Sequence, residues 1–449
     1  MSESKIGIVI CNYNKKHFII PCIESVLNSD MKGFDVYVVD NASTDGSVEA
    51  IRDNFSDKVT LIVNSENLGG SGGFNTGLIA ALASPKHYEY LMCVDNDILM
   101  DNDNIRILFE FLEDCPEVGM AGSKICRMQR PERLQEMGAA IDFDKCAIVP
   151  YYKDMLDDDT LPEVQYCDYV PACSLMIRRS VIEAVGIMPQ ENFIYWDDME
   201  WGYLVNRAGY KVVSLRAARV LHDMGTNSGT SYFPTYYFWR NRLHFFMKYT
   251  PDDKYENMMS VLLEDLFKTL YGCYYKGKAN QISVMMHAFD DAVHDKRGKA
   301  AEDVILERDT VADRLSDLIY SRKKLVIGFD GNYKLLQDII LKAKAVCGDA
   351  GAIPIEIVCD NAEEMQNQHP ECSISVACDV HDYVGRTDTL VLKMCEHVSK
   401  VEDKSLRIVH IDGYSNLLAD ERDVAHFESM DYAMKMFIES QKVLMRRGR

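Results

Sequence analysis

The sequence predicts an α/β protein whose main domain is a mostly parallel sheet, followed by a helical segment and a separate small C-terminal α/β domain. Three observations support this fold class. Short apolar runs alternate with helix-like patterns over the first 125 residues, polar residues directly follow several of these runs, and the same alternation returns after residue 323. Such alternation is typical of parallel sheets with helices on both faces. We therefore expect three parts, at residues 1–230, 231–322 and 323–449.

The first part begins with four predicted strands and the helices between them. The strands are expected at residues 5–11, 34–40, 59–63 and 90–95, and the helices at residues 15–29, 46–55, 73–83 and 102–113. The glycine-rich segment NLGGSGGFNTG, residues 67–77, predicts a loop whose backbone can approach a ligand, with a plain flexible connector as the alternative. Ligands of such sheets bind beyond the carboxyl ends of the strands, so we expect a site there.

The remainder of the chain supplies the other two parts. A further strand is expected within residues 169–179, and aromatic-rich helices over residues 232–300. The charged run at residues 301–324 predicts a helical connector. Five apolar runs after it predict parallel strands of the C-terminal domain. For that domain the sequence leaves three roles open: binding a partner, forming an oligomer or holding an acceptor.

Composition excludes several classes of protein. The net charge of −21 repels nucleic acid, so no nucleic-acid partner is expected. The N-terminus lacks the layout of a signal peptide, and no apolar run approaches the roughly 18 residues of a membrane span. We therefore expect a cytoplasmic protein with reduced thiols. Its basic tail QKVLMRRGR could touch the inner face of the cell membrane, although a solvated end is the favoured reading.

Two carboxylates follow the fourth predicted strand, in the segment VDNDI. Residues i and i+2 of an extended chain point to the same side, so Asp95 and Asp97 can converge on one cation or on a diphosphate that carries one. The alternative is a polar turn, because Asp and Asn are common turn residues. The neighbouring motifs favour the cation.

Six segments, taken in order over residues 5–250, resemble inverting family 2 glycosyltransferases with the GT-A fold. They are IVICNYN, VVDNASTDGS, VDNDI, YWDDMEW, VLHDMG and YYFWRNRLHFF. Each segment alone is a weak signal, whereas six in the family's order form a strong one. The segments NLGGSGGFN and WDDME together most resemble those of bacterial galactofuranosyltransferases, with rhamnosyltransferases as near relatives.

The resemblance implies a set of site residues. The metal ligands would be Asp95, Asp97 and His222, holding Mn²⁺ or Mg²⁺. The nucleotide would be bound by Asn12, Asp40, Asn67 and Asp95. The catalytic base would be Asp198, and donor and acceptor would be contacted by Gly70, Trp196, Asp197, Glu200 and Arg240.

Several of these assignments have a structural alternative. His222 could be a satisfied histidine at a strand end, and Asp197 and Asp198 could simply favour the start of a helix. The aromatic residues around Arg240 and Arg242 are more often core than ligand platform. The two arginines themselves could bind phosphate, since guanidinium groups match phosphate oxygens.

The implied activity is transfer of a sugar from a nucleotide diphosphate sugar to a glycan hydroxyl in bacterial cell-wall or surface polysaccharide synthesis. UDP-galactofuranose is the favoured donor, dTDP-rhamnose is the alternative, and the acceptor could be lipid-linked. A non-catalytic nucleotide-sugar-binding scaffold is less favoured, because it would not need the acidic motifs and the histidine together. A nucleotidyltransferase is disfavoured, because CNYNKKH after the first strand contains no glycine.

Overall fold

The computed structural model describes residues 5–223, 229–347, 353–369, 372–376 and 379–448. The chain forms two compact units. The N-terminal unit comprises Met1–Met259, Val284–Glu307 and Arg447–Arg449, and the C-terminal unit comprises Ser260–Ser283 and Arg308–Arg446. The described residues contain no helix that is both long and apolar enough to cross a membrane.

The N-terminal unit is built on a ten-stranded sheet, and eight of its strands follow the order β10-β12-β6-β11-β4-β1-β2-β3. Their bounds are β1 Ile6–Asn12, β2 Phe34–Asp40, β3 Thr60–Val63, β4 Tyr90–Asp95, β6 Val118–Arg127, β10 Val164–Cys167, β11 Ser174–Arg178 and β12 Lys211–His222. Neighbours among β1 to β4 are parallel, and so are β6 and β12. The antiparallel β11 joins these two parallel halves. The predicted α/β fold class is confirmed.

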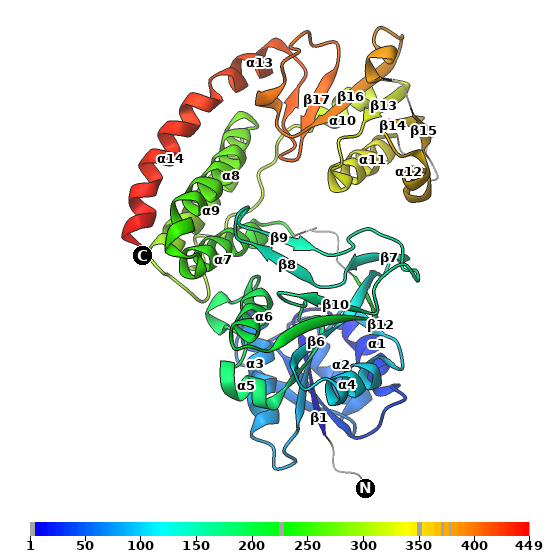
Figure 1. Ribbon diagram of the computed structural model, residues 1–449, viewed down its shortest axis with the longest axis vertical. Helices are drawn as coiled ribbons and strands as arrows, with labels where there is room; N and C mark the ends of the chain where they lie inside the picture. The colour runs from blue at the N-terminus through cyan, green and yellow to red at the C-terminus, as the bar shows by residue number, and fades with distance from the viewer. Residues whose placement is uncertain (1–4, 224–228, 348–352, 370–371, 377–378, 449) are drawn as a thin grey trace. The chain divides into compact units, whose positions relative to one another are not determined.

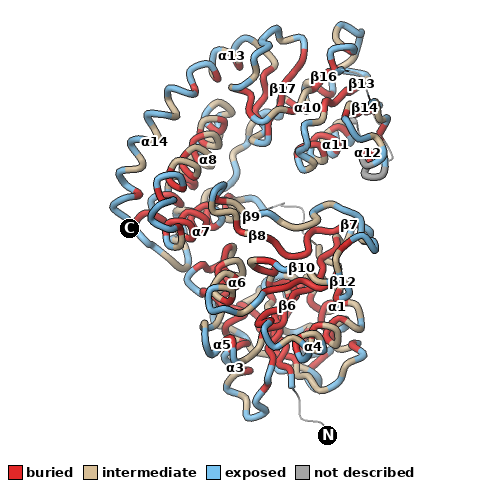
Figure 2. The backbone as a smooth tube through the Cα atoms, viewed as in Figure 1, coloured by how far each residue is buried: buried red, intermediate tan, exposed pale blue. Residues whose placement is uncertain are grey.

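Helices cover both faces of this sheet, as Figure 1 shows. One face is packed by α1 Lys16–Leu27, α2 Ser47–Phe55 and α4 Asn104–Asp114. The other is packed by α3 Gly69–Leu82, α5 Arg179–Val185 and α6 Asp197–Arg207. The strands between them are buried over most of their length (Figure 2). Both faces of a parallel sheet need such cover, because its strands are apolar on both sides.

The glycine-rich segment is helical, which corrects the predicted loop. It forms the first half of α3, whose helix begins at Gly69. A Cβ atom added at Gly73 would lie 2.3 Å from Cys11 Sγ, and one added at Gly77 would lie 2.3 Å from Val9 Cγ1. The glycines therefore let α3 approach β1 more closely than a side chain would permit. Close packing, not chain flexibility, explains this run.

Shorter strands add to the main sheet or form a separate hairpin. β5 Ile98–Met100 pairs with β12, and β7 Arg130–Glu136 pairs with β6. β8 Ala139–Asp142 and β9 Ala147–Pro150 form a separate hairpin. The expected aromatic helices are α7 Phe233–Tyr249, α8 Tyr255–Tyr275 and α9 Ala279–Val293.

The predicted helical connector is helical only at its end, in α10 Arg314–Tyr320. Earlier in the segment, Glu307 forms a β-bridge with Ser231, and the backbone N–H of Tyr232 donates to Leu306 O at 2.9 Å. These tertiary hydrogen bonds hold the segment extended and override its helical propensity. Asp313 then caps α10 by accepting from Ser316 N.

The C-terminal unit contains the second predicted sheet, with the order β15-β14-β13-β16-β17-β18. Its strands are β13 Lys324–Gly328, β14 Ile355–Val358, β15 Ser373–Ser375, β16 Thr389–Cys395, β17 Val409–Asp412 and β18 Leu417–Leu418. All neighbours are parallel except β17 and β18. The helices that follow α10 are α11 Tyr333–Cys347, α12 Ala362–Gln368, α13 Glu421–Glu428 and α14 Met430–Arg447.

Candidate active site

Polar side chains gather where β1, β2 and β4 end. In the sheet register Asn12 lies beside Asp40, and Cys11 lies beside Asp95. Asn12 Nδ2 donates to Asp40 Oδ2 at 2.9 Å, and Asn96 Nδ2 donates to Asn12 Oδ1 at 2.8 Å. Parallel strands bring their carboxyl ends to one edge, so residues far apart in sequence meet here.

Asp95, Asp97 and His222 form a cluster at this edge. One ligand atom from each lies within 4.8 Å of the others. The turn after β4 leads into β5, and β5 pairs with the end of β12 so that Ile98 lies opposite His222. This pairing brings His222 Nε2 to 3.3 Å from Asp97 Oδ1. Two carboxylates and one imidazole are ligands that suit a divalent cation such as Mn²⁺.

The electrostatics of the cluster are those of buried, mutually interacting charges. Burial, reinforced by the charge of Asp97, raises the pKa of Asp95 to about 7. Burial would also raise the pKa of Asp97, but its contacts with His222 and Lys15 hold that pKa below its ordinary value. The ion pair with Asp97 raises the pKa of His222 against the opposing effect of burial.

Asp197 and Asp198 occupy the first turn of α6, next to the cluster. The backbone N–H groups of Ala172 and Met199 donate to the carboxylate of Asp198 at 3.1 and 2.8 Å. Cys173, the neighbour of Ala172, accepts from the backbone N–H of Asp95, so the acidic pair and the cluster share one edge. Burial and the charge of Asp198 raise the pKa of Asp197 to about 8, and burial raises the pKa of Asp198.

The loop before this acidic pair is strained and firmly held. Phe193, Tyr195 and Trp196 all have positive φ angles, of 67°, 61° and 67°. Such conformations cost on the order of 1–3 kcal/mol each and need support from their surroundings. Asn241 of α7 supplies it, because its Nδ2 donates to the carbonyl oxygens of Asn192, Ile194 and Tyr195 at 2.9, 2.9 and 2.8 Å.

Three residues predicted to contact substrate are internal supports. Arg240 is 1% exposed and donates to Asn192 O and Gly298 O at 3.0 and 2.7 Å. Trp196 is also 1% exposed and packs on Phe245 and Phe246, so its ring has no free face for a sugar.

Glu200 is the third. It is 1% exposed and bonded to Lys248, Tyr249 and Asn192 at 2.8, 2.6 and 2.9 Å. The motifs that carry these three residues were recognised in the sequence, but the packing of α7 turns their side chains inward. Arg242, likewise buried, donates through Nε to Cys146 O at 2.9 Å.

The residues predicted to bind the nucleotide lie at the same edge. Asp40 is fully buried, and both of its oxygens accept hydrogen bonds, from Asn12 Nδ2 and from Ser43 N at 2.8 Å. Asn67 Oδ1 accepts from Gly69 N at 2.8 Å and so holds the start of α3. A Cβ atom added at Gly70 would lie 3.8 Å from Asp197 Oδ2, which places the start of α3 beside the acidic pair.

Sequence reasoning missed three residues of this edge. Gln135 Oε1 lies 2.8 Å from His222 Nδ1, and Lys15 Nζ lies 3.1 Å from Asp97 Oδ2. Glu136 is 8% exposed, and within the described part of the chain its Oε2 has no hydrogen-bond partner. Burial raises the pKa of Glu136 to about 7, and the charge of Asp198 adds to that rise. Lys15 directly follows the IVICNYN motif, whereas β7, the strand that carries Gln135 and Glu136, contains no recognised motif.

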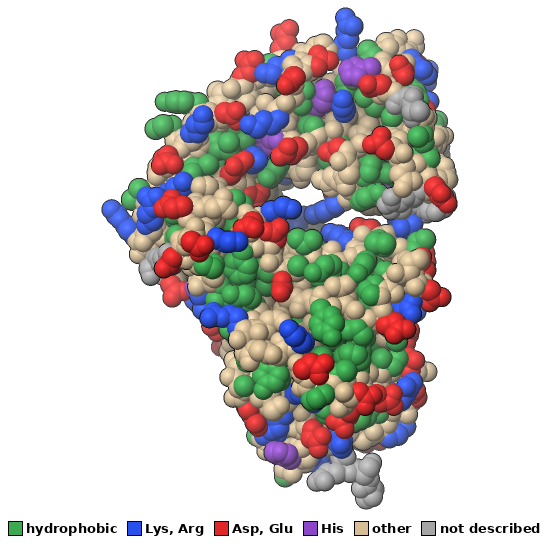
Figure 3. Space-filling model, in the orientation of Figure 1, with side chains coloured by type: hydrophobic (Ala, Val, Ile, Leu, Met, Phe, Trp, Pro, Cys, Tyr) green, Lys and Arg blue, Asp and Glu red, His purple; other side chains and the backbone are tan. Residues whose placement is uncertain are grey.

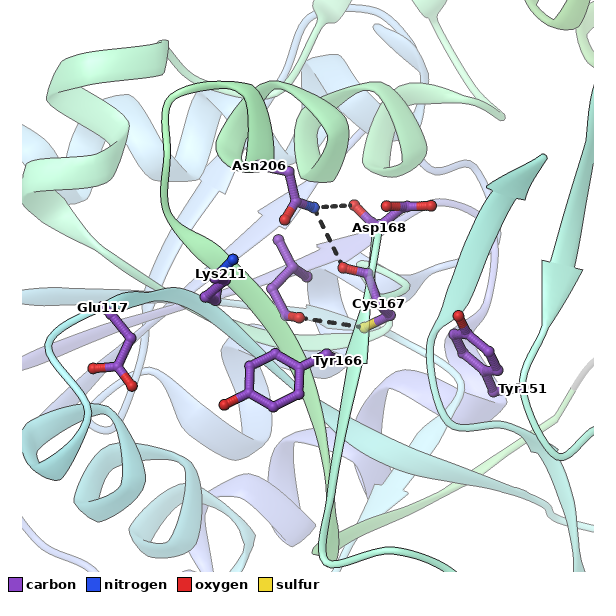
Figure 4. A pocket seen from close by; sticks show the side chains of 8 residues that line it. Glu117, Tyr151, Tyr166, Cys167, Asp168, Asn206 and Lys211 are labelled. Atoms are coloured by element: carbon purple, nitrogen blue, oxygen red, sulfur yellow. Dashed lines mark hydrogen bonds between the residues drawn. The ribbon is translucent and has the colours of Figure 1, made fainter. Parts of the chain in front are cut away.

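A separate hollow of about 520 Å³ lies at the edge strand β10 (Figure 4). It is lined by Tyr151, Tyr166, Asp168, Asn206 and Lys211 among others. Asn206 Nδ2 donates to Cys167 O and Asp168 O at 3.3 and 2.9 Å, so its amide maintains the wall. None of the predicted site residues lines this hollow.

The acidic cluster and the histidine lie at the carboxyl edge of a mainly parallel α/β sheet, the edge at which folds of this class bind their ligands. Residues 7–185 match the family model described as Glycosyl transferase family 2. This stretch of the chain is therefore similar to that family, and the predicted α/β fold class with a mostly parallel sheet is confirmed.

Several known proteins are similar to this chain. The galactofuranosyltransferase GlfT2 of Mycolicibacterium smegmatis is 27% identical over 198 residues, which cover 40% of this chain and 30% of that protein. GlfT2 of Mycobacterium tuberculosis is 26% identical over 197 residues, covering 40% and 31%. The chain thus spans about a third of the length of these curated relatives. The solved structure of GalNAc-T7 with UDP, GalNAc and Mn²⁺ is 14% identical, with a TM-score of 0.46 and coverage of 58% of this chain and 50% of that one.

Proposed function

We propose that the chain is a metal-dependent, inverting glycosyltransferase that moves a sugar from a nucleotide diphosphate sugar to a hydroxyl group of a glycan acceptor. The observation that carries the proposal is the meeting of Asp95, Asp97 and His222 within 4.8 Å, at the edge that also holds Asp198. The proposed setting is bacterial cell-surface polysaccharide synthesis, where the acceptor could be lipid-linked.

The residues present fit a divalent cation. Asp95, Asp97 and His222 would hold it, since oxygen-rich sites with one imidazole suit Mn²⁺ or Mg²⁺. When bound, the ion would stabilise the negative charge that develops on the departing diphosphate. Gln135 fixes the orientation of His222 through its other ring nitrogen, as outer hydrogen-bond partners of metal-binding histidines commonly do.

Asp198 is the proposed general base. Two backbone N–H groups fix its carboxylate, and burial raises its pKa, which makes it a stronger base than an exposed aspartate. As the acceptor oxygen forms its bond to the anomeric carbon, the hydroxyl proton passes to Asp198 and the bond between the sugar and the diphosphate breaks. A positioned base of this kind contributes about 10²- to 10⁴-fold to the rate.

UDP-galactofuranose is the favoured donor. Support comes from the segments NLGGSGGFN and WDDME and from the relatives whose name is galactofuranosyltransferase. dTDP-rhamnose is the alternative donor, and the two differ in both the base and the sugar.

The experiment that tests the proposal is a donor screen with purified full-length chain. Hydrolysis or transfer from UDP-galactofuranose, dTDP-rhamnose and common UDP-hexoses is measured with Mn²⁺, with Mg²⁺ and with EDTA. Activity should require the cation and be lost in Asp97→Ala. The matched control Asp103→Ala removes a carboxylate that is 47% exposed and paired with Arg106, and it should retain activity. Turnover that is equal in EDTA, or none with any donor, would refute the proposal.

A further inference from the structure

The sheet of the C-terminal unit has the strand order of a ligand-binding fold. Numbered from β13 in chain order, its strands lie in the order 3-2-1-4-5-6. The chain changes direction across the sheet between β13 and β16, and open α/β sheets bind ligands beyond the carboxyl ends of the strands at such a point. This unit contains none of the residues of the candidate active site.

The two faces of this sheet are covered differently. One is packed by apolar residues of α10, α11 and α12. On the other, the short turn η4 Val380–Tyr383 packs against Val326, Val391 and Ile408. Helices normally cover both faces of a parallel sheet. The end of this second face is packed by a separate cluster that includes Val398, Leu418 and Phe427, so a cavity can remain between that cluster and η4.

A cavity of about 360 Å³ lies on that second face, within the roughly 300–1,000 Å³ typical of small-ligand sites. Lys393 and His410 line it from the strands, where they are register partners on β16 and β17. Gly328, at the end of β13, is the register partner of Lys393 on its other side. The cavity therefore lies over β16 and β17, and β16 is one of the two strands between which the strand order reverses.

The inner wall of the cavity carries polar groups without partners. His410 is 8% exposed, yet its Nδ1 has no hydrogen-bond partner within the described part of the chain. The described residues also offer the ammonium group of Lys393 no hydrogen bond or ion pair. An unpaired polar atom at a buried position, such as His410 Nδ1, carries a free-energy cost that a hydrogen bond to a bound ligand would remove.

The strands contribute the partly buried Lys393 and the buried His410 to this cavity, whereas the exposed lining residues include Glu396, Lys400, Glu402 and Asp403. A phosphate group fits beside Lys393, and carboxylates at the exposed side are suited to accept hydrogen bonds from hydroxyl groups. The start of α11 is a poor alternative for the phosphate, since Asp330 occupies it and accepts from Asn332 N at 3.1 Å.

We propose that this cavity binds a small phosphorylated molecule rich in hydroxyl groups, of the nucleotide or sugar phosphate class. The phosphate contacts Lys393 and His410, and the hydroxyl groups contact Glu402 and Asp403. The site is distinct from the donor site of the proposed glycosyltransfer, and its occupancy does not require a divalent cation.

Calorimetric titration of the full-length chain in EDTA tests this inference. The probes are UMP, AMP, ribose 5-phosphate and inorganic phosphate, and the first three distinguish a nucleotide from a sugar phosphate. At least one organic phosphate should bind, with affinity weakened by roughly 10-fold or more in Lys393→Ala and in His410→Asn. Lys323→Ala is the matched control, because that exposed lysine pairs with Asp388 and does not line the cavity.

Loss of binding in Lys393→Ala and His410→Asn separates this site from the donor site, because both residues belong to the C-terminal unit and the candidate active site belongs to the N-terminal unit. The inference is overturned if no probe binds, if inorganic phosphate binds as tightly as the organic probes, or if binding survives Lys393→Ala. Should Lys393→Ala lower the melting temperature more than Lys323→Ala does, Lys393→Gln replaces it and the same criteria apply.

Discussion

At the scale of single residues, the site holds two groups of buried carboxylates in opposite situations. Asp197 and Glu136 have pKa values raised to about 8 and about 7 because burial disfavours their charged forms. Burial acts in the same direction on Glu200, but hydrogen bonds from Lys248 and Tyr249 bring the pKa of Glu200 below its ordinary value. Ionisation of Asp197 and Glu136 therefore lowers the free energy of unfolding, whereas ionisation of Glu200 raises it.

This difference predicts opposite pH dependences of stability. A folded-state pKa above the unfolded value means that stability is lost as pH rises, here between about pH 4 and pH 8. At pH 8.5 the free energy of unfolding of Asp197→Asn and of Glu136→Gln should therefore exceed that of the natural chain by on the order of 1 kcal/mol or more. This difference in the free energy of unfolding should vanish near pH 4.5. Denaturant titration in EDTA, with no donor, measures this.

Glu200→Gln is the matched control with the reverse sign. Its stabilising contribution is present above about pH 4 and is lost as pH falls, so the variant should be less stable than the natural chain at pH 8.5. Variants that all shift in the same direction would contradict the opposing environments described for these carboxylates.

Asp198 is expected to affect chemistry, not binding. Asp198→Asn removes the proton acceptor but retains the hydrogen-bonding shape of the side chain, so turnover should fall by about 10²-fold or more while donor affinity stays nearly constant. Transfer rates and donor titrations in Mn²⁺ measure both quantities. Normal turnover in this variant would indicate that the general base is Asp197 or Glu136 instead.

At the scale of elements, the loop over residues 192–196 depends on α7. Asn241→Ala removes three hydrogen bonds to that loop. Relaxation of its positive-φ residues should displace Asp198 and lower kcat by about 10²-fold with little change in donor affinity. Because Asn241 only positions the loop and takes no part in proton transfer, the pH dependence of kcat in Asn241→Ala should match that of the natural chain. A changed pH profile with normal kcat would count against this role.

The contact between α3 and the sheet provides a second test at this scale. Gly73→Ala and Gly77→Ala would place a methyl group 2.3 Å from Cys11 Sγ or Val9 Cγ1, and overpacking of this kind costs about 1–3 kcal/mol. Gly70→Ala, in the same helix, meets its nearest neighbours at 3.8 Å and should change stability far less. Thermal melts of the three variants provide the comparison, and equal melting temperatures would disprove the close-packing explanation.

Sequence patterns predicted the strands and their polar ends well, because alternation and strand-end residues are local properties. The meeting of Asp95 and Asp97 with His222 followed from motif order. The inward orientation of Trp196 and Arg240 could not be predicted, since it depends on how α7 packs. Glu136 was missed because its position follows from an irregular register between β6 and β7.

At the scale of the whole molecule, charges of both signs are interspersed over the face shown in Figure 3, although acidic residues are in excess. The boundary between the two units falls within α8, after Met259. The later part of α8 contributes Phe267 and Tyr271 to an apolar cluster with Val398 and Phe427 of the C-terminal unit.

This arrangement predicts the behaviour of a chain truncated after residue 307. Its donor affinity in Mn²⁺ should match that of the full chain, because the described site residues all belong to the N-terminal unit. Loss of the C-terminal partners leaves Phe267 and Tyr271 uncovered, so the truncated chain should self-associate. Size-exclusion chromatography should show less association in a truncated Phe267→Ser, Tyr271→Ser chain. A monomeric truncated chain without donor affinity would instead tie the site to the C-terminal unit.

The hydrogen bond from Arg240 to Gly298 has a consequence for the order in which the protein matures during translation. Arg240 holds Asn192, but its guanidinium group is also secured by a carbonyl group synthesised 58 residues later. Between them the ribosome makes Ser260–Ser283, which belongs to a unit that stays incomplete until residues beyond 308 emerge. The last of these contacts therefore forms only after every recognised motif has been synthesised. A nascent chain ending near residue 250 would carry all the motifs and the Asn241 contacts but would lack the Gly298 carbonyl group that secures Arg240.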